Sequence, residues 1–76
     1  MKTVVITGGS EGLGKAIAMR LASSHNVIIL ARNEEKLRSA AAEIGCAYKV
    51  CDVSDYKQVE AVMSEIGTVD CLVNNA

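Results

Sequence analysis

The stretch Val4-Val5-Ile6-Thr7-Gly8-Gly9-Ser10-Glu11-Gly12-Leu13-Gly14 decides the fold of this chain. It begins with an unbroken apolar run, which is typical of a β-strand buried on both faces. Several glycines follow in close succession, and apolar residues then recur at Ile17 and Leu21 with the spacing of a helix. The stretch therefore predicts a buried strand over residues 2–7, a glycine-rich turn and a helix over residues 12–24.

The rest of the chain continues this alternation of short apolar runs and helical segments. Further strands are predicted over residues 26–31, 46–51 and 69–74. Strictly alternating strands and helices predict an α/β fold with a parallel sheet, and right-handed crossovers favour the strand order 3-2-1-4. The fold class is a Rossmann-like, doubly wound parallel sheet of the order β-α-β-α-β-α-β. It is partial, because it holds one mononucleotide-binding half and the first strand of the other.

Two further helices separate these strands. Asn33 is predicted to cap the first of them, and the two glutamates that follow suit the positive end of the helix dipole. Gly45 is expected to end this helix. Ser54 is predicted to cap the last helix, which Gly67 ends.

Length and composition predict one small globular domain. The chain has 76 residues, of which 50% are hydrophobic and 22% charged. A net charge of −1 and an aromatic content of 3% disfavour nucleic acid and anionic membranes as partners. The N-terminal apolar run is too short for a signal peptide or a membrane helix, so a cytoplasmic location is expected.

Three cysteines, Cys46, Cys51 and Cys71, are the obvious candidates for a disulfide or metal site. Their number is odd, no Cys-x-x-Cys pair is present, and only His25 could join them as an imidazole ligand. We therefore expect no metal site, and small buried apolar cysteines in a reducing cytoplasm.

The glycine turn lies at the carboxyl end of the first strand, where open α/β sheets bind ligands. Gly8 allows a tight turn, Gly12 lets the backbone approach a pyrophosphate, and Gly14 lets the helix pack close to the sheet. Free N–H groups of the first helical turn then face the phosphates of a dinucleotide. The residues between the glycines belong to the same predicted site: Ser10, Glu11 and Leu13.

Three motifs together give the chain a family resemblance. The turn reads Thr-Gly-x-x-x-Gly-x-Gly from Thr7, Asp52-Val53 follows the third strand, and Asn74-Asn75-Ala76 ends the fourth. In these motifs the sequence resembles the short-chain dehydrogenase/reductase family over its whole length. The resemblance implies that Asp52 and Val53 contact the adenine ring, and that Asn74 and Ala76 help to hold the sheet and the cofactor ribose. An ordinary strand end and helix cap would also explain Asp52, and Asn74 could simply satisfy backbone groups.

Arg32 bears on the choice of cofactor. An acidic residue at the tip of the second strand would bind the ribose hydroxyls of NAD, but this tip reads Leu30-Ala31-Arg32. Arg32 can form charge-assisted hydrogen bonds to a 2′-phosphate, so NADP(H) is favoured over NAD(H). Two observations weigh against this: Arg32 could be a solvated loop charge, and relatives that prefer NADP often carry a basic residue where Glu11 stands.

The resemblance also implies catalytic residues that this chain does not show. Family members use a Tyr-x-x-x-Lys pair and an upstream Ser for hydride transfer to or from a carbonyl or alcohol substrate. Asp52 stands four residues after Tyr48, and Glu60 stands four residues after Tyr56. No catalytic residue is assigned, and whether the chain by itself is an enzyme stays open.

Two hypotheses follow for the chain as a whole. In the first, residues 1–76 are the N-terminal part of a single NAD(P)-binding Rossmann domain, truncated before its catalytic part. The chain would then be the NADP(H)-binding portion of an oxidoreductase whose full-length parent also binds the substrate. In the alternative, it is a non-catalytic nucleotide-binding or interaction fragment that self-associates through the open edge of the fourth strand.

Overall fold

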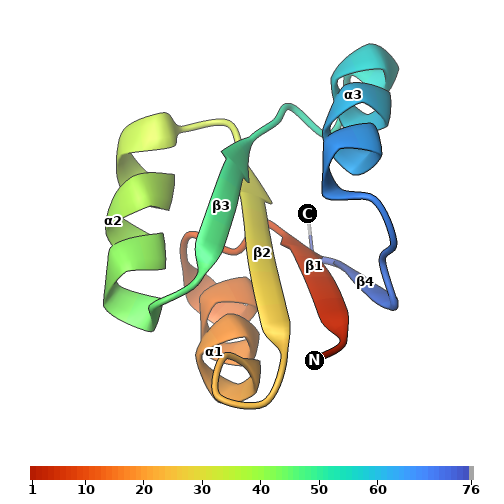
Figure 1. Cartoon of the computed structure of the whole chain (residues 1–76). Helices are drawn as coiled ribbons and strands as arrows, with labels where there is room; N and C mark the ends of the chain where they lie inside the picture. Colours follow the sequence, from red (N-terminus) through yellow and green to blue (C-terminus); the bar gives the residue numbers. More distant parts are fainter. Residues whose placement is uncertain (76) are drawn as a thin grey trace.

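The computed structural model describes residues 1–75 and contains a four-stranded parallel sheet with helices on both faces (Figure 1). The elements in chain order are β1 (Thr3–Thr7), α1 (Gly12–Leu21), β2 (Asn26–Ala31), α2 (Glu34–Ile44), β3 (Ala47–Val50), α3 (Tyr56–Ile66) and β4 (Cys71–Asn74). The strand order is β3-β2-β1-β4. The predicted α/β fold class and strand order are therefore confirmed.

The register brings the carboxyl ends of all four strands to one edge of the sheet. Thr7, the last residue of β1, lies opposite Leu30 of β2 and Asn74 of β4. On the far side of β2, Ala31 lies opposite Val50 of β3. Every loop that follows a strand therefore starts from this edge.

Two apolar clusters, one on each face, hold the helices to the sheet. Alternate residues of a strand point to opposite faces, and here Ile6 and Ile29 pack with Leu37 beneath α1 and α2. Val5 and Leu30 belong to the other cluster, which α3 covers. Because β1 and β2 are buried on both faces, their sequences are continuously apolar, as the sequence suggested.

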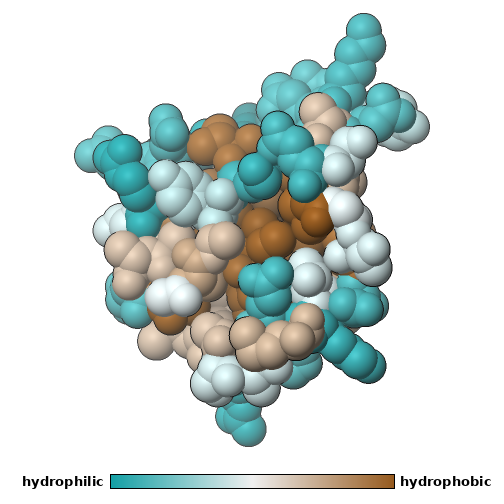
Figure 2. Space-filling view, in the orientation of Figure 1, coloured by the Kyte–Doolittle hydropathy of each residue, from teal (hydrophilic) through white to brown (hydrophobic). Residues whose placement is uncertain are grey.

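The side of the sheet that carries α3 is less completely covered. Figure 2 shows apolar side chains gathered over β1 and β2 on this face, framed by hydrophilic ones. Leu72 of β4 is 54% exposed there. Since β4 is the last strand in the sheet order, its outer edge has no strand neighbour among residues 1–75.

Four elements are shorter than the sequence predicted, and β1 differs only in that it begins at Thr3, one residue later than expected. The first helix ends at Leu21, where the N–H of His25 bonds to the Leu21 carbonyl at 2.9 Å and begins the turn into β2. The third and fourth strands cover residues 47–50 and 71–74. In the third, the N–H of Cys51 still bonds to the Ala31 carbonyl at 2.9 Å, so backbone pairing continues one residue past the strand.

The predicted cap of the last helix was wrong by one residue. Asn33 caps α2 as expected, and Gly45 ends it in the left-handed conformation. For α3, however, the cap is Asp55, whose carboxylate accepts from the N–H groups of Lys57 and Gln58. The hydroxyl of Ser54 is occupied elsewhere, because it donates to Asp52 at 2.6 Å.

The cysteines differ in burial. Cys51 is buried and Cys46 is half-buried, but Cys71 is exposed on β4, so the expectation of burial was wrong for Cys71. All three are free thiols. Within residues 1–75 no three His, Cys, Asp or Glu side chains lie together as metal ligands would. In the same residues no helix has the length and apolar character needed to cross a membrane.

Candidate functional site

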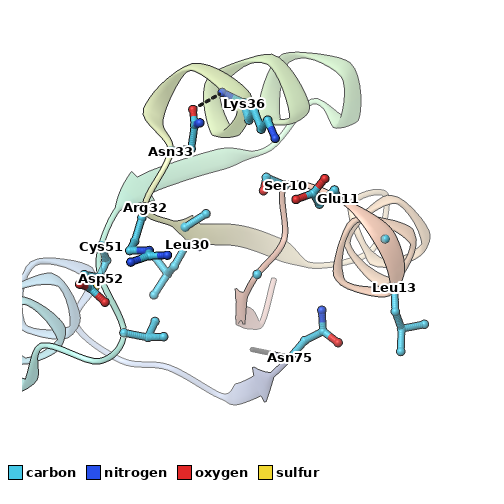
Figure 3. A pocket seen from close by; sticks show the side chains of 14 residues that line it. Ser10, Glu11, Leu13, Leu30, Arg32, Asn33, Lys36, Cys51, Asp52 and Asn75 are labelled. Carbon is cyan, nitrogen blue, oxygen red and sulfur yellow. Dashed lines mark hydrogen bonds between the residues drawn. The ribbon is translucent and has the colours of Figure 1, made fainter.

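An open pocket of about 800 Å³ lies at the carboxyl edge of the sheet (Figure 3). Four segments line it: the loop after β1, the end of β2 with the start of α2, the segment 51–53 and Asn75. The pocket lies where the chain order of the strands reverses, since β1 has β2 on one side and β4 on the other. This is the place where open α/β sheets bind ligands, and the volume suits a cofactor or small molecule.

The N-terminus of α1 opens into this pocket with unused backbone donors. The first N–H groups of any α-helix have no acceptor within the helix. The residue at the cap position of α1, Glu11, makes no side-chain hydrogen bond to them, and the first turn holds no acidic residue. By contrast, Asn33 and Asp55 cap α2 and α3. The end of α1 is therefore the helix terminus best suited to an anion.

Glycine is required in the loop for two different reasons. Gly8 and Gly12 have φ of 67° and 62°, which lie in the left-handed region that other residues rarely adopt. A Cβ added to Gly12 would meet nothing within 4 Å, so this backbone is open toward the pocket. A Cβ added to Gly14 would collide with the Gly8 carbonyl oxygen and, at 2.6 Å, with Asn75 Nδ2. The close approach at Gly14 is thus to the loop and the residue after β4, whereas the sequence suggested the sheet.

Thr7 joins the loop to the end of β4. Its side chain is buried, and its hydroxyl accepts from the N–H of Asn75 at 2.9 Å. The same hydroxyl donates to Asn74 Oδ1 at 3.1 Å, with the Val73 carbonyl at 3.4 Å as a second acceptor. One hydroxyl therefore fixes the position of residues 73–75 beside the glycine-rich loop that follows β1.

Asp52 stays ionised in the wall opposite this loop. Its Oδ1 accepts from the hydroxyl of Ser54 at 2.6 Å and from the Ser54 N–H at 3.0 Å. These hydrogen bonds, with a smaller contribution from the positive charge of Arg32, lower the pKa of the Asp52 carboxyl. Figure 3 shows Arg32 and Asp52 on the same side of the pocket.

Cys51 contributes an apolar wall and no nucleophile. Its side chain is fully buried at the end of β3. Burial raises the pKa of the thiol, and the charges of Asp52 and Asp55 raise it further. The sulfur is therefore held as a neutral thiol at neutral pH.

The pocket collects most of the residues that the sequence singled out. Those that line it are Gly8, Ser10, Glu11, Gly12, Leu13, Arg32, Asp52 and Val53. Leu13 is 68% exposed on α1, and Figure 3 places its side chain away from Arg32 and Asp52. Gly14 and Asn74 do not line the pocket but support it through Gly8 and Thr7. Ala76 lies outside the described residues.

Three polar lining residues were not predicted as site residues: Asn33, Lys36 and Asn75. Asn75 had a usable signal, because it lies inside the Asn-Asn-Ala motif. Asn33 was identified only as a helix cap. Lys36 belongs to no motif that the sequence shows. It lines the pocket because it lies in the first turn of α2.

The two tyrosines lie apart from the pocket walls. Tyr48 belongs to β3, and Tyr56 begins α3 with its hydroxyl donating to Glu60 at 3.4 Å. Neither lines the pocket.

Known proteins match this chain throughout. A family model described as short chain dehydrogenase matches residues 2–76. D-xylose 1-dehydrogenase of Caulobacter vibrioides is 41% identical over 81 residues, which cover 99% of this chain and 33% of that protein. The chain thus spans about a third of the length of this relative.

Solved structures match it as well. An actinorhodin polyketide ketoreductase with NADPH has a TM-score of 0.83 and 35% identity, covering 99% of this chain and 33% of that one. An NADP complex of RhlG from Pseudomonas aeruginosa has a TM-score of 0.89 and 30% identity, and the match covers 99% of this chain and 34% of that one. The architecture of residues 1–75 therefore resembles that of about a third of each of these proteins.

The Thr7 hydroxyl should contribute measurably to the stability of the fold. We expect Thr7→Val to lower the free energy of unfolding by about 1–3 kcal/mol, because the N–H of Asn75 loses its buried acceptor. Thr3→Val on the same strand is the matched control, since Thr3 Oγ1 accepts only one exposed bond of 3.3 Å from Asn26. Its effect should stay within about 0.5 kcal/mol. Urea denaturation measures both, and equal losses would contradict this role of Thr7.

The pKa of Asp52 should depend mainly on Ser54. We expect Ser54→Ala to raise it toward its usual value, and Arg32→Ala to raise it less, as followed by NMR titration of the carboxyl carbon. Because the pKa is lower in the folded than in the unfolded chain, the ionised group stabilises the fold above its unfolded pKa. This contribution is lost as the pH falls through the folded pKa. A larger effect of Arg32→Ala than of Ser54→Ala would contradict this order of causes.

Proposed function

The chain belongs to the short chain dehydrogenase family, and we propose that it forms the NADP(H)-binding portion of an oxidoreductase of that family. The observation that carries this proposal is one pocket that combines an uncapped helix N-terminus, Arg32 and an ionised Asp52. The whole protein would transfer hydride between a nicotinamide cofactor and a carbonyl or alcohol substrate. Residues 1–76 would be the N-terminal part of a single NAD(P)-binding domain.

The pyrophosphate would bind at the N-terminus of α1. The N–H groups of the first turn supply donors, and the backbone at Gly12 is open to a close approach. Ser10 and Leu13 line the same end of the pocket, so Ser10 could add a hydroxyl donor and Leu13 a backbone contact. This set of donors fits an anionic group.

The adenosine half would lie toward β2 and β3. Asp52 and Val53 line this part of the pocket and would contact the adenine ring. We propose that two residues at the end of β4 help to hold the cofactor ribose. They are Asn74, which is bonded to Thr7, and Ala76, which belongs to the same motif. The cofactor would supply the hydride, while these residues bind and orient it.

NADP(H) is proposed over NAD(H) for three reasons. Arg32 is exposed at the end of β2 and lines the pocket. Ala31 offers no carboxylate to the ribose hydroxyls that NAD would present there. The two structural relatives described above were solved with NADPH and NADP. Glu11 lines the same pocket and opposes a bound phosphate by its charge.

A cytoplasmic location also forms part of the proposal. All three cysteines are free thiols, which suits a reducing compartment.

Cofactor binding should depend on Arg32. We expect the chain to bind NADPH weakly, and Arg32→Ala to weaken this binding by about tenfold or more through loss of charge-assisted hydrogen bonds to the 2′-phosphate. NADH binding should change little. Fluorescence titration with each cofactor measures both, and Arg38→Ala, an exposed arginine further along α2 that does not line the pocket, is the matched control.

NADPH binding that Arg32→Ala leaves unchanged would overturn the assignment of the 2′-phosphate. The chain is also expected to show no turnover on carbonyl substrates. Turnover by the purified chain would contradict the absence of catalytic residues from it.

A second candidate function is association through β4. The outer edge of this strand is unpaired in the part of the chain that the structure describes, and Leu72 and Cys71 are exposed on it. An open apolar edge presents backbone donors and acceptors to another strand. The alternative to a cofactor-binding portion is therefore a non-catalytic fragment that pairs by this edge.

If the edge mediates association, Leu72→Lys should shift the chain toward monomer in sedimentation experiments over a range of concentrations. A charge on the edge strand is one of the ways in which proteins prevent such pairing. Met19→Lys, at a 51% exposed site on α1, is the control and should have no effect. A wild-type chain that stays monomeric at all concentrations would contradict the second candidate.

A further inference from the structure

Lys36 is the charged residue of the pocket that no motif accounts for. It is the third residue of α2, and Figure 3 shows its side chain extending from the helix toward Ser10 and Glu11 on the opposite wall. The two preceding residues, Glu34 and Glu35, do not line the pocket. The first turn of α2 therefore presents to the pocket its positive charge and not its negative ones.

A second, smaller cavity of about 250 Å³ lies between α1 and α2, and its walls include Lys15 and Glu43. Ser10, Glu11 and Lys36 line this cavity and the main pocket alike. These three residues mark the junction of the two cavities, where a small group attached to a ligand in the main pocket has room to project.

The charges around this junction are unequally compensated. Arg32 lines only the main pocket, where its charge makes a small contribution to lowering the pKa of Asp52. Lys15 is paired with Glu43 at 2.9 Å. Lys36 forms no ion pair with any of residues 1–75. It is the cation at the junction that remains free to neutralise an added anion.

We propose that Lys36 is a second cation for the 2′-phosphate of the cofactor, acting beside Arg32 from the junction of the two cavities. The inference rests on the proposed function, because it concerns the adenosine end of the same cofactor. A phosphate monoester carries a charge of about −1.5 to −2 at pH 7, which exceeds the single positive charge of one arginine. Lys36 supplies the remaining charge, and it offsets the repulsion from Glu11 across the junction.

The position of Lys36 also explains how a loop with Glu11 can tolerate this phosphate. A basic residue at the position of Glu11 would act from α1, whereas Lys36 acts from α2 on the other side of the junction. The positive charge is thus carried by a different helix. Specificity for the 2′-phosphate would then be a property of β2 and α2 together.

The experiment compares adenosine 2′,5′-bisphosphate with adenosine 5′-monophosphate, two probes that differ only in the 2′-phosphate. Both are titrated into the 76-residue chain by calorimetry. We expect Lys36→Gln to weaken the binding of the bisphosphate by about five- to tenfold and to leave the affinity for the monophosphate unchanged. Lys57→Gln, an exposed lysine in the first turn of α3 outside both cavities, is the matched control and should change neither.

Two further variants separate the contributions. Lys36→Arg keeps the charge and should retain most of the bisphosphate affinity. Glu11→Gln removes the opposing charge and should strengthen bisphosphate binding about two- to fivefold. Because Lys36 is exposed and Gln is a good helix former, Lys36→Gln should keep the fold, as urea denaturation checks.

The outcomes distinguish this inference from the proposed function. If Arg32→Ala weakens bisphosphate binding but Lys36→Gln does not, the role of Lys36 is overturned and the proposed function stands. If the wild-type chain binds both probes equally, or neither, the preference for NADP(H) or nucleotide binding itself is wrong, and the role of Lys36 falls with it.

Discussion

The parallel register of β1 between β2 and β4 is the constraint on which the rest of the structure depends. Because Thr7 lies opposite Leu30 and Asn74, three strand ends meet at one edge of the sheet. The register thus makes neighbours of the loop after β1, the start of α2 and the segment after β4, and the Thr7 hydroxyl then fixes the last of these in place. A shift of one residue would exchange the two faces of β1, so that Val5 and Ile6 would each lose their packing partners, and it would displace these ends from one another. Core packing therefore also places the pocket.

Features that depend on local sequence were predicted well. The apolar runs of β1 and β2 indicate burial on both faces, and Gly45 ends its helix for the reason expected, a left-handed conformation. The glycine loop was identifiable because Gly8 and Gly12 adopt positive φ between a strand and a helix. Alternation of strands and helices then fixes the topology, since so few connections are allowed. Most of the pocket follows, because its walls are the loops at one sheet edge.

Features that depend on competition or on distant neighbours were not predictable. Ser54 and Asp55 are both good cap residues, but the Ser54 hydroxyl bonds to Asp52 while the Asp55 carboxylate accepts from the first turn of α3. Burial of Cys71 depends on what covers β4, which its own sequence does not encode. From the sequence alone Lys36 is indistinguishable from any surface lysine, and only the packing of α2 near the glycine-rich loop brings it to the pocket. In each case the missing information is a contact made by tertiary structure.

The Thr7 hydroxyl has a consequence for the order of folding. Its bond to Asn75 spans 68 positions of sequence, whereas β1, α1 and β2 are contiguous from residue 3 to residue 31. Long-range contacts require the closure of long loops and form late in topologically complex domains. During synthesis the first three elements can assemble well before residues 74 and 75 leave the ribosome. The start of α1 thus gains its neighbour Asn75 only after β4 has docked, so the pocket is completed at a later stage than the core that carries it.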